Sequence, residues 1–133
     1  MNAETIGRAK QISLIEDDPR IRQLIQAEIA DEGHLVRSFS SAEDFLKVAE
    51  TLHSDLVLLD LMLPGMDGLS CLAELQKIPS EKPHRVVVVT ALNDTATRQQ
   101  AISLGAVDYI LKPDLFERLP RLLEELQVDH SES

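Results

Sequence analysis

The chain has 133 residues and a formal net charge of −10. That length suits a single domain that buries about two thirds of the surface of its unfolded chain, and it is too short for two domains. The 13 Lys and Arg residues are scattered along the sequence, whereas a nucleic-acid surface needs them clustered. We therefore expect no direct nucleic-acid binding.

No apolar run approaches the ~20 residues that a membrane helix needs, so no membrane association is expected. The opening residues 1–5 lack the charged and apolar parts of a secretory signal, which makes the cytoplasm the expected location. The single cysteine, Cys71, excludes an internal disulfide and a thiolate metal cluster. We expect it to pack as a small apolar residue on a helix.

The first part of the chain predicts a strand, an acidic turn and a helix. Residues 1–10 are polar and predict a lead-in, and residues 11–15 are β-prone. The turn that follows contains Glu16, Asp17 and Asp18. Asp18 is expected to cap a helix that begins at Pro19, and Gly33 suits the position that ends it; these two are the helix boundary signals.

A second strand is predicted over residues 35–39, and the Ser40–Glu43 segment matches a capping box for the next helix. The unbroken apolar run 56–59 then predicts a strand that is buried on both faces, as in a parallel sheet covered by helices. Asp60 comes directly after this run, so it is delivered to the carboxyl end of the strand. A loop with Pro and Gly leads into a third helix, which ends before Pro79.

Four consecutive valines at 86–89 predict another fully buried strand, which ends in Thr90. Asn93 or Asp94 can cap the next helix, which has the weakest apolar stripe and ends at Gly105.

The fifth strand, 107–111, ends in Lys112 and Pro113. Proline is tolerated in the first turn of a helix, so the last helix is expected to begin near Glu117 and to contain Pro120 in that turn. Residues 128–133 form a polar tail.

Five strands alternate with five helices, which predicts an α/β fold: a doubly wound parallel sheet flanked by helices. Right-handed crossovers place the carboxyl ends of all strands on one edge, where open parallel sheets bind ligands. The polar residues expected to meet at that edge are Glu16, Asp17, Asp60, Thr90 and Lys112.

Together these residues form a coherent chemical set. Three carboxylates within a few ångströms repel one another, and Mg²⁺ relieves that repulsion while keeping water ligands. An Asp such as Asp60 can then act as a nucleophile toward a phosphoryl group, while the metal and Lys112 stabilise charge on the transferring oxygens. The hydroxyl of Thr90 supplies a neutral donor.

On these motifs the chain resembles a response-regulator receiver domain of bacterial two-component signalling. The resemblance covers residues 11–127 and implies a flavodoxin-like topology with strand order 2-1-3-4-5, between the lead-in 1–10 and the tail 128–133. The matching segments are Ile15-Glu16-Asp17-Asp18, Leu59–Gly68, Thr90-Ala91 and Gly105–Pro113.

The resemblance also implies a role for each residue. Asp60 would accept the phosphoryl group from a phosphohistidine on a sensor histidine kinase or a histidine phosphotransfer protein. The Mg²⁺ ligands would be Asp17, Asp60 and the backbone carbonyl of Met62, with Glu16 acting through water. Thr90 would bind a phosphoryl oxygen and Lys112 would pair with the phosphate.

A switch is implied as well: Thr90 moves toward the phosphoryl group, Tyr109 turns inward, and the face of the fourth helix, fifth strand and fifth helix changes for an output partner. From its sequence position alone, Tyr109 fits equally well as a half-buried strand aromatic. The Lys112–Pro113 bond is commonly cis in this family. A homodimer through the same face is a further arrangement that the family allows. No turnover of an outside substrate is expected.

Three other functions share parts of this pattern. A phosphatase of the haloacid dehalogenase type would need a second Asp where this chain has Met62. A flavodoxin-like FMN carrier would need a phosphate loop where Glu16 and its acidic neighbours stand. A phosphorylation-independent interaction domain, or pseudo-receiver, remains open.

Residues 114–120 differ from the Pro-Phe continuation of many DNA-binding regulators, so membership of that subgroup is doubtful. Whether the chain stands alone or belongs to a longer regulator or hybrid kinase is also open. The four histidines lie in connectors or the tail without metal-ligand spacing and are expected to be solvated: His34, His53, His84 and His130.

Overall fold

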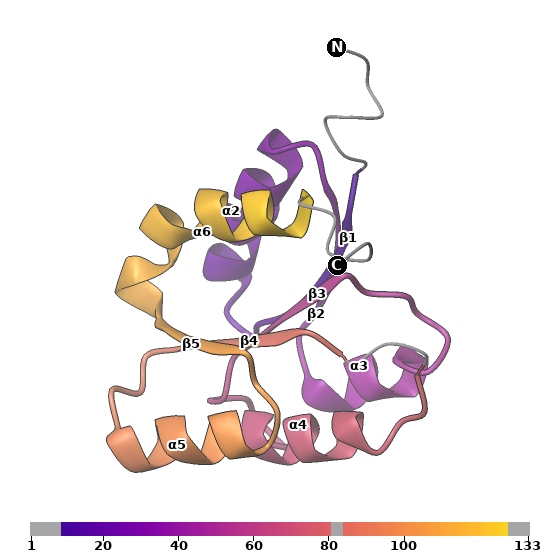
Figure 1. Cartoon of the computed structure of the whole chain (residues 1–133), viewed down its shortest axis with the longest axis vertical. Helices are drawn as coiled ribbons and strands as arrows, with labels where there is room; N and C mark the ends of the chain where they lie inside the picture. Colours follow the sequence, from indigo (N-terminus) through magenta and orange to yellow (C-terminus); the bar gives the residue numbers. More distant parts are fainter. Residues whose placement is uncertain (1–8, 81–83, 128–133) are drawn as a thin grey trace.

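In a computed structural model, the strands form one parallel sheet with helices on both faces (Figure 1). The structure describes residues 9–80 and 84–127. The strand order is β2-β1-β3-β4-β5, which confirms the predicted topology. In chain order the elements are β1 (Gln11–Ile15), α2 (Pro19–Asp31), β2 (Leu35–Phe39), α3 (Ala42–Val48), β3 (Leu56–Leu59), α4 (Gly68–Gln76), β4 (Val86–Thr90), α5 (Thr95–Ser103), β5 (Asp108–Leu111) and α6 (Lys112–Gln127).

The sheet separates two apolar cores. Helices α2 and α6 cover one face, and α3, α4 and α5 cover the other (Figure 1). In β3, Leu56 and Leu58 belong to the core under α2 and α6, while Val57 and Leu59 belong to the opposite core. All these side chains are buried, which confirms that the central strand is covered on both faces.

Local capping mostly follows the sequence, with one correction. Asp18 caps α2 by accepting a hydrogen bond from the N–H of Arg20, and Gly33 takes a φ of 89° after the helix. The predicted capping box at Ser40 is wrong, because the N-cap of α3 is Ser41, whose hydroxyl accepts from the N–H of Asp44.

The predicted start of the last helix is wrong. Helix α6 begins at Lys112 and contains Pro120 in its interior. A proline there removes one helical hydrogen bond, but a continuous helix buries a stripe of leucines at helical spacing that starts before the proline. The described residues contain no cis peptide bond, so the Lys112–Pro113 bond is trans. The buried stripe consists of Leu115, Leu119, Leu122, Leu123 and Leu126.

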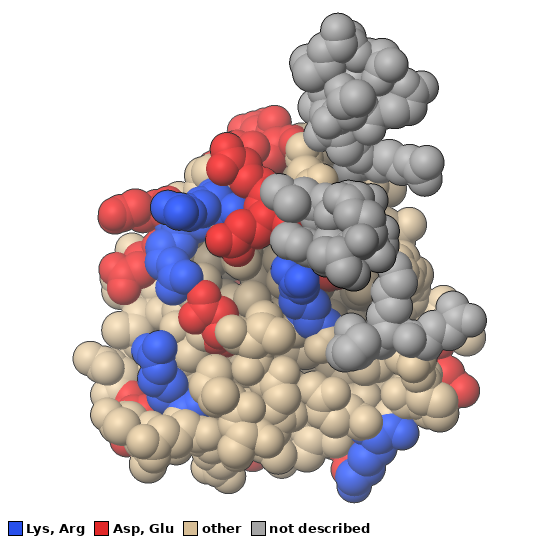
Figure 2. All heavy atoms as spheres, in the orientation of Figure 1, with Lys and Arg blue, Asp and Glu red and all other residues tan. Residues whose placement is uncertain are grey.

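The surface and the helices give two further observations. On the face shown in Figure 2, Lys and Arg side chains are interspersed with Asp and Glu and do not form one continuous basic patch. Within residues 9–80 and 84–127, no helix has the length and apolar character needed to cross a membrane.

His34 is buried, contrary to the expectation that the histidines are solvated. Its side chain is only 5% exposed, and its Nδ1 accepts a hydrogen bond from the backbone N–H of Lys10 at 2.9 Å. Its Nε2 lies 3.2 Å from the side-chain amide nitrogen of Gln127. His34 therefore joins the start of β1 to the end of α6. His53 is exposed, His84 is partly buried, and His130 lies outside the described residues.

Replacing His34 by Gln should destabilise the fold by about 1–2 kcal/mol, because the partly buried N–H of Lys10 loses the Nδ1 that accepts its hydrogen bond. The exposed His53→Gln variant is the control and should unfold like the wild type. Urea unfolding of all three proteins measures the difference.

The same residue predicts a pH dependence. Burial lowers the pKa of His34; Lys10 also lowers it, while Glu32 and Asp55 raise it. The unfolded chain therefore takes up the proton first, so the contribution of His34 is present above about pH 6.5 and is lost as the pH falls below it. Between about pH 7.5 and 5.5, the wild type should lose more stability than His34→Gln. Equal losses would contradict this assignment.

Cys71 is buried in α4, as expected for a small core residue. Burial, with smaller contributions from the charges of Glu43 and Asp67, raises the pKa of its thiol to about 12. Since the thiolate is the reactive form, a disulfide thiol reagent should modify the native protein only as fast as the chain opens. Absorbance of the released thiolate measures this, and urea should make the reaction immediate; fast labelling of the folded protein would contradict the burial.

Candidate functional site

The pairing of the central strands brings the acidic residues together. Ile15 of β1 pairs with Leu59 of β3, so the residues that follow each strand leave the sheet side by side. The backbone N–H of Asp60 donates to the carbonyl of Ile15 at 3.1 Å, which fixes this register one residue beyond the strand. The backbone therefore holds Glu16 beside Asp60.

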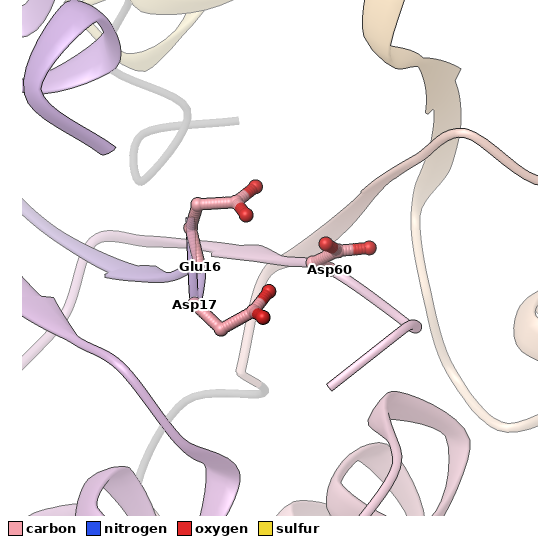
Figure 3. A group of neighbouring side chains, drawn as sticks. All are labelled: Glu16, Asp17 and Asp60. Carbon is pink, nitrogen blue, oxygen red and sulfur yellow. The ribbon is translucent and has the colours of Figure 1, made fainter. Parts of the chain in front are cut away.

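Glu16, Asp17 and Asp60 form one carboxylate cluster, shown as sticks in Figure 3. Each contributes one oxygen, and these oxygens all lie within 4.8 Å of one another. Glu16 and Asp60 are 1% and 2% exposed, whereas Asp17 is exposed. The cluster is thus anchored in the protein and open to solvent on the side of Asp17. Hard oxygen donors with room for water ligands fit Mg²⁺.

Lys112 is the cation that contacts this cluster. Its Nζ lies 3.0 Å from Oε1 of Glu16 and 2.9 Å from Oδ2 of Asp60. Burial by itself lowers the pKa of Lys112, but the hydrogen bonds to Asp60 and Glu16 outweigh it, so the pKa is raised and the ammonium stays charged. One ammonium does not balance three carboxylates, so the cluster keeps a negative charge that attracts a further cation.

The burial of Glu16 shifts the pKa of its carboxyl group. Desolvation raises the pKa of its carboxyl group, and the nearby charge of Asp60 adds to the rise. The backbone N–H of Asp18, which donates to Oε2 of Glu16 at 3.0 Å, lowers the pKa, and so does Lys112. The net shift is upward, as expected for a carboxylate enclosed beside another acid.

The loop after Asp60 is held tightly against the end of β3. Oδ1 of Asp60 accepts a hydrogen bond from the N–H of Met62 at 3.1 Å. Helix α4 begins at Gly68, whose N–H donates to the carbonyl of Leu61 at 2.9 Å. A Cβ at Gly68 would overlap the backbone of Asp60 and Leu61, so only glycine lets the helix begin this close to the acceptor position.

Thr90 and Tyr109 both bind the backbone of the same residue, Leu92. Thr90 is fully buried at the end of β4, and its hydroxyl accepts from the N–H of Leu92 at 3.3 Å. The hydroxyl of Tyr109, a residue only 4% exposed, donates to the carbonyl of Leu92 at 2.7 Å. The ring therefore lies inside the protein and is more deeply buried than a half-buried strand aromatic. Among the described residues, no hydrogen bond joins Thr90 directly to Asp60.

The structure reveals two further side chains at this edge that the sequence did not single out. Arg22 of α2 reaches back to the turn after β1 and donates to the carbonyls of Glu16 and Asp17. Glu43 of α3 accepts from the N–H of Met66 at 3.0 Å, so it secures the loop after β3 in place of the capping box predicted for it. Both are long side chains that bind backbone atoms of another segment, and no local sequence pattern announces such contacts.

Comparison with known families agrees with this arrangement. Residues 12–124 match the model of the response regulator receiver domain. The chain belongs to this family. Receiver domains of response regulators are phosphoacceptor domains in general, and they interact with histidine kinases and output domains.

Among its relatives, this receiver is 36% identical over 104 residues to the probable transcriptional regulator ycf27 of Porphyridium aerugineum, covering 78% of this chain and 42% of that protein. It is 31% identical over 116 residues to the two-component response regulator PhoP of Pseudomonas aeruginosa, covering 87% of this chain and 51% of that protein. The chain thus spans about half the length, or less, of these curated relatives.

A solved structure is also similar. It is the receiver domain of a sensor histidine kinase from Pseudomonas aeruginosa PAO1, which holds a magnesium ion in its active-site cleft. The TM-score is 0.80 at 26% identity, covering 89% of this chain and 97% of that one.

Tyr109 can be observed by itself, since it is the only tyrosine and the chain has no tryptophan. Burial raises the pKa of its hydroxyl above 10; Asp94 and Asp60 also raise it, while Arg98 lowers it. Absorbance at the phenolate band should therefore show ionisation above pH 10 in the folded receiver and a return to about pH 10 in urea. Stability from this group is fully present below about pH 10 and is lost as the pH rises from there through the raised pKa of the folded state. A native midpoint at the ordinary value would contradict the inward placement, and Tyr109→Phe should remove the signal.

Proposed function

We propose that this receiver accepts a phosphoryl group on Asp60 from a phosphohistidine, with residues 11–127 acting as the receiver domain. The observation that carries the proposal is the carboxylate cluster together with Lys112, because a buried strand-end Asp contacts a cation and lies beside two further acids. The family match supports the same role.

Mg²⁺ is the metal that this donor set suits. Asp17 and Asp60 would bind it directly, the backbone carbonyl of Met62 would be a further ligand, and Glu16 would act through water. The bound ion would neutralise charge on the phosphoryl oxygens. The magnesium held by the similar kinase receiver supports this choice.

In the transfer, a carboxylate oxygen of Asp60 forms a bond to phosphorus as the bond between phosphorus and the imidazole nitrogen of the donor breaks. The imidazole leaves with the bonding electron pair and takes up a proton. Lys112, which already contacts Oδ2 of Asp60, pairs with a phosphoryl oxygen, and the hydroxyl of Thr90 donates to another. The domain turns over only its own aspartyl phosphate and no outside substrate.

The proposed switch acts through the backbone of Leu92. Because Thr90 binds the N–H of this residue and Tyr109 binds its carbonyl, a shift of Thr90 toward the phosphoryl group changes the segment that carries the Tyr109 contact. Phosphorylation would thus bias a two-state equilibrium of the face formed by α5, β5 and α6. An output domain or partner protein, or a second copy of the chain, would bind this face. The donor would be a sensor histidine kinase or a histidine phosphotransfer protein.

The first experiment is intact-mass spectrometry after incubation with acetyl phosphate and Mg²⁺. The wild type should gain one phosphoryl group and lose the gain under chelation, whereas Asp60→Asn should never show it. The matched control is Asp31→Asn at the far end of α2, an exposed acid outside the cluster, which should behave like the wild type.

Two other outcomes are informative. If the folded wild type binds Mg²⁺ but is not modified, phosphoacceptance is contradicted and the domain acts as a phosphorylation-independent interaction module. If Asp60→Asn is modified as fully as the wild type, the acceptor is another residue.

A further inference from the structure

Arg22 lies on the first turn of α2 and points back to the turn that carries two of the cluster's acids. Its Nη1 donates to the carbonyl of Glu16 at 2.7 Å and to the carbonyl of Asp17 at 3.3 Å. Among residues 9–80 and 84–127, the ion pairs do not include Arg22. The guanidinium thus binds the backbone of the acidic turn and does not contact its carboxylates.

The acids of the turn differ in how their side chains are held. The carboxylate of Glu16 contacts Lys112 and the N–H of Asp18. The side chain of Asp17 is exposed, and its carboxylate has no hydrogen bond or ion pair to any described residue. Its direction therefore depends on the backbone that carries it, and Arg22 is the side chain that binds the carbonyls of that backbone.

We propose that Arg22 is a positioning residue for the metal site, which holds the Glu16–Asp17 turn so that the carboxylate of Asp17 stays within reach of a divalent cation bound with Asp60. The inference rests on the metal role proposed above. It attributes to Arg22 an effect opposite to that of its charge: a nearby cation repels Mg²⁺, whereas a well-placed ligand turn strengthens binding.

The two effects predict opposite changes in metal affinity when Arg22 is replaced, so a titration distinguishes them. We would titrate the full chain with Mn²⁺, a spectroscopic substitute for Mg²⁺, and follow water-proton relaxation. Arg22→Gln should bind Mn²⁺ about five- to tenfold more weakly than the wild type, the scale of one lost hydrogen bond. If only charge mattered, the same variant would bind more tightly.

Arg20→Gln is the matched control. Arg20 lies on the same turn of α2 and carries the same charge, but its side chain is 90% exposed and its charged group lies 3.8 Å from Asp18. The control should bind Mn²⁺ at least as tightly as the wild type. An equal loss in both variants, or an Arg22→Gln variant that binds as tightly as the wild type, would overturn the inference.

Thermal unfolding with and without Mn²⁺ separates positioning from general stability. A purely structural role for Arg22 would lower the midpoint by the same amount in both conditions, which would contradict the proposal. A positioning role makes the rise caused by Mn²⁺ smaller in Arg22→Gln. Should that variant not fold, Arg22→Lys keeps the charge but ends one bond earlier, and its Mn²⁺ affinity should still fall below that of the wild type; an affinity equal to the wild type would contradict the inference.

The result also separates this inference from the proposed function. A wild type that binds no Mn²⁺ would contradict both. A wild type that binds Mn²⁺ and accepts phosphate, with unchanged affinity in Arg22→Gln, would contradict the role of Arg22 alone.

Discussion

The ammonium group of Lys112 lies between two carboxylates that are almost inaccessible to water, those of Glu16 and Asp60. Removing one partner from such a contact leaves an uncompensated buried charge, which is costly. The same contact joins the ends of β1, β3 and β5, so it holds together segments that are distant in sequence. Since one ammonium does not balance three carboxylates, the cluster remains acidic and attracts a further cation.

The sheet makes this contact possible. In β3, alternate side chains fill the two cores, so a slip of one residue would exchange Leu and Val between them. The register that pairs Ile15 with Leu59 places Asp60 directly beyond the end of β3, next to the end of β1. Gly68 lacks a Cβ, so α4 can begin directly against the backbone of Asp60 and Leu61.

Prediction from the sequence succeeded where the signal is local and failed where it is not. The strands at 11–15 and 35–39 have the predicted bounds, because β-prone runs between turn residues need no distant information. The predicted start of the last helix is wrong because Pro120 is a local helix breaker, whereas the buried leucines of α6 favour a continuous helix. The burial of His34 has no local signal, because its two partners, Lys10 and Gln127, are far from it in the chain.

The order of strands and helices along the chain, and the polar residues at the strand ends, can be predicted from apolar periodicity and turn residues within a few positions. The family motifs also lie in short segments. The inward position of Tyr109 on the carbonyl of Leu92, and the contact of Arg22 with the acidic turn, become visible in the folded chain. Long side chains choose their partners by which segments the fold brings within reach, and that choice has no local signature.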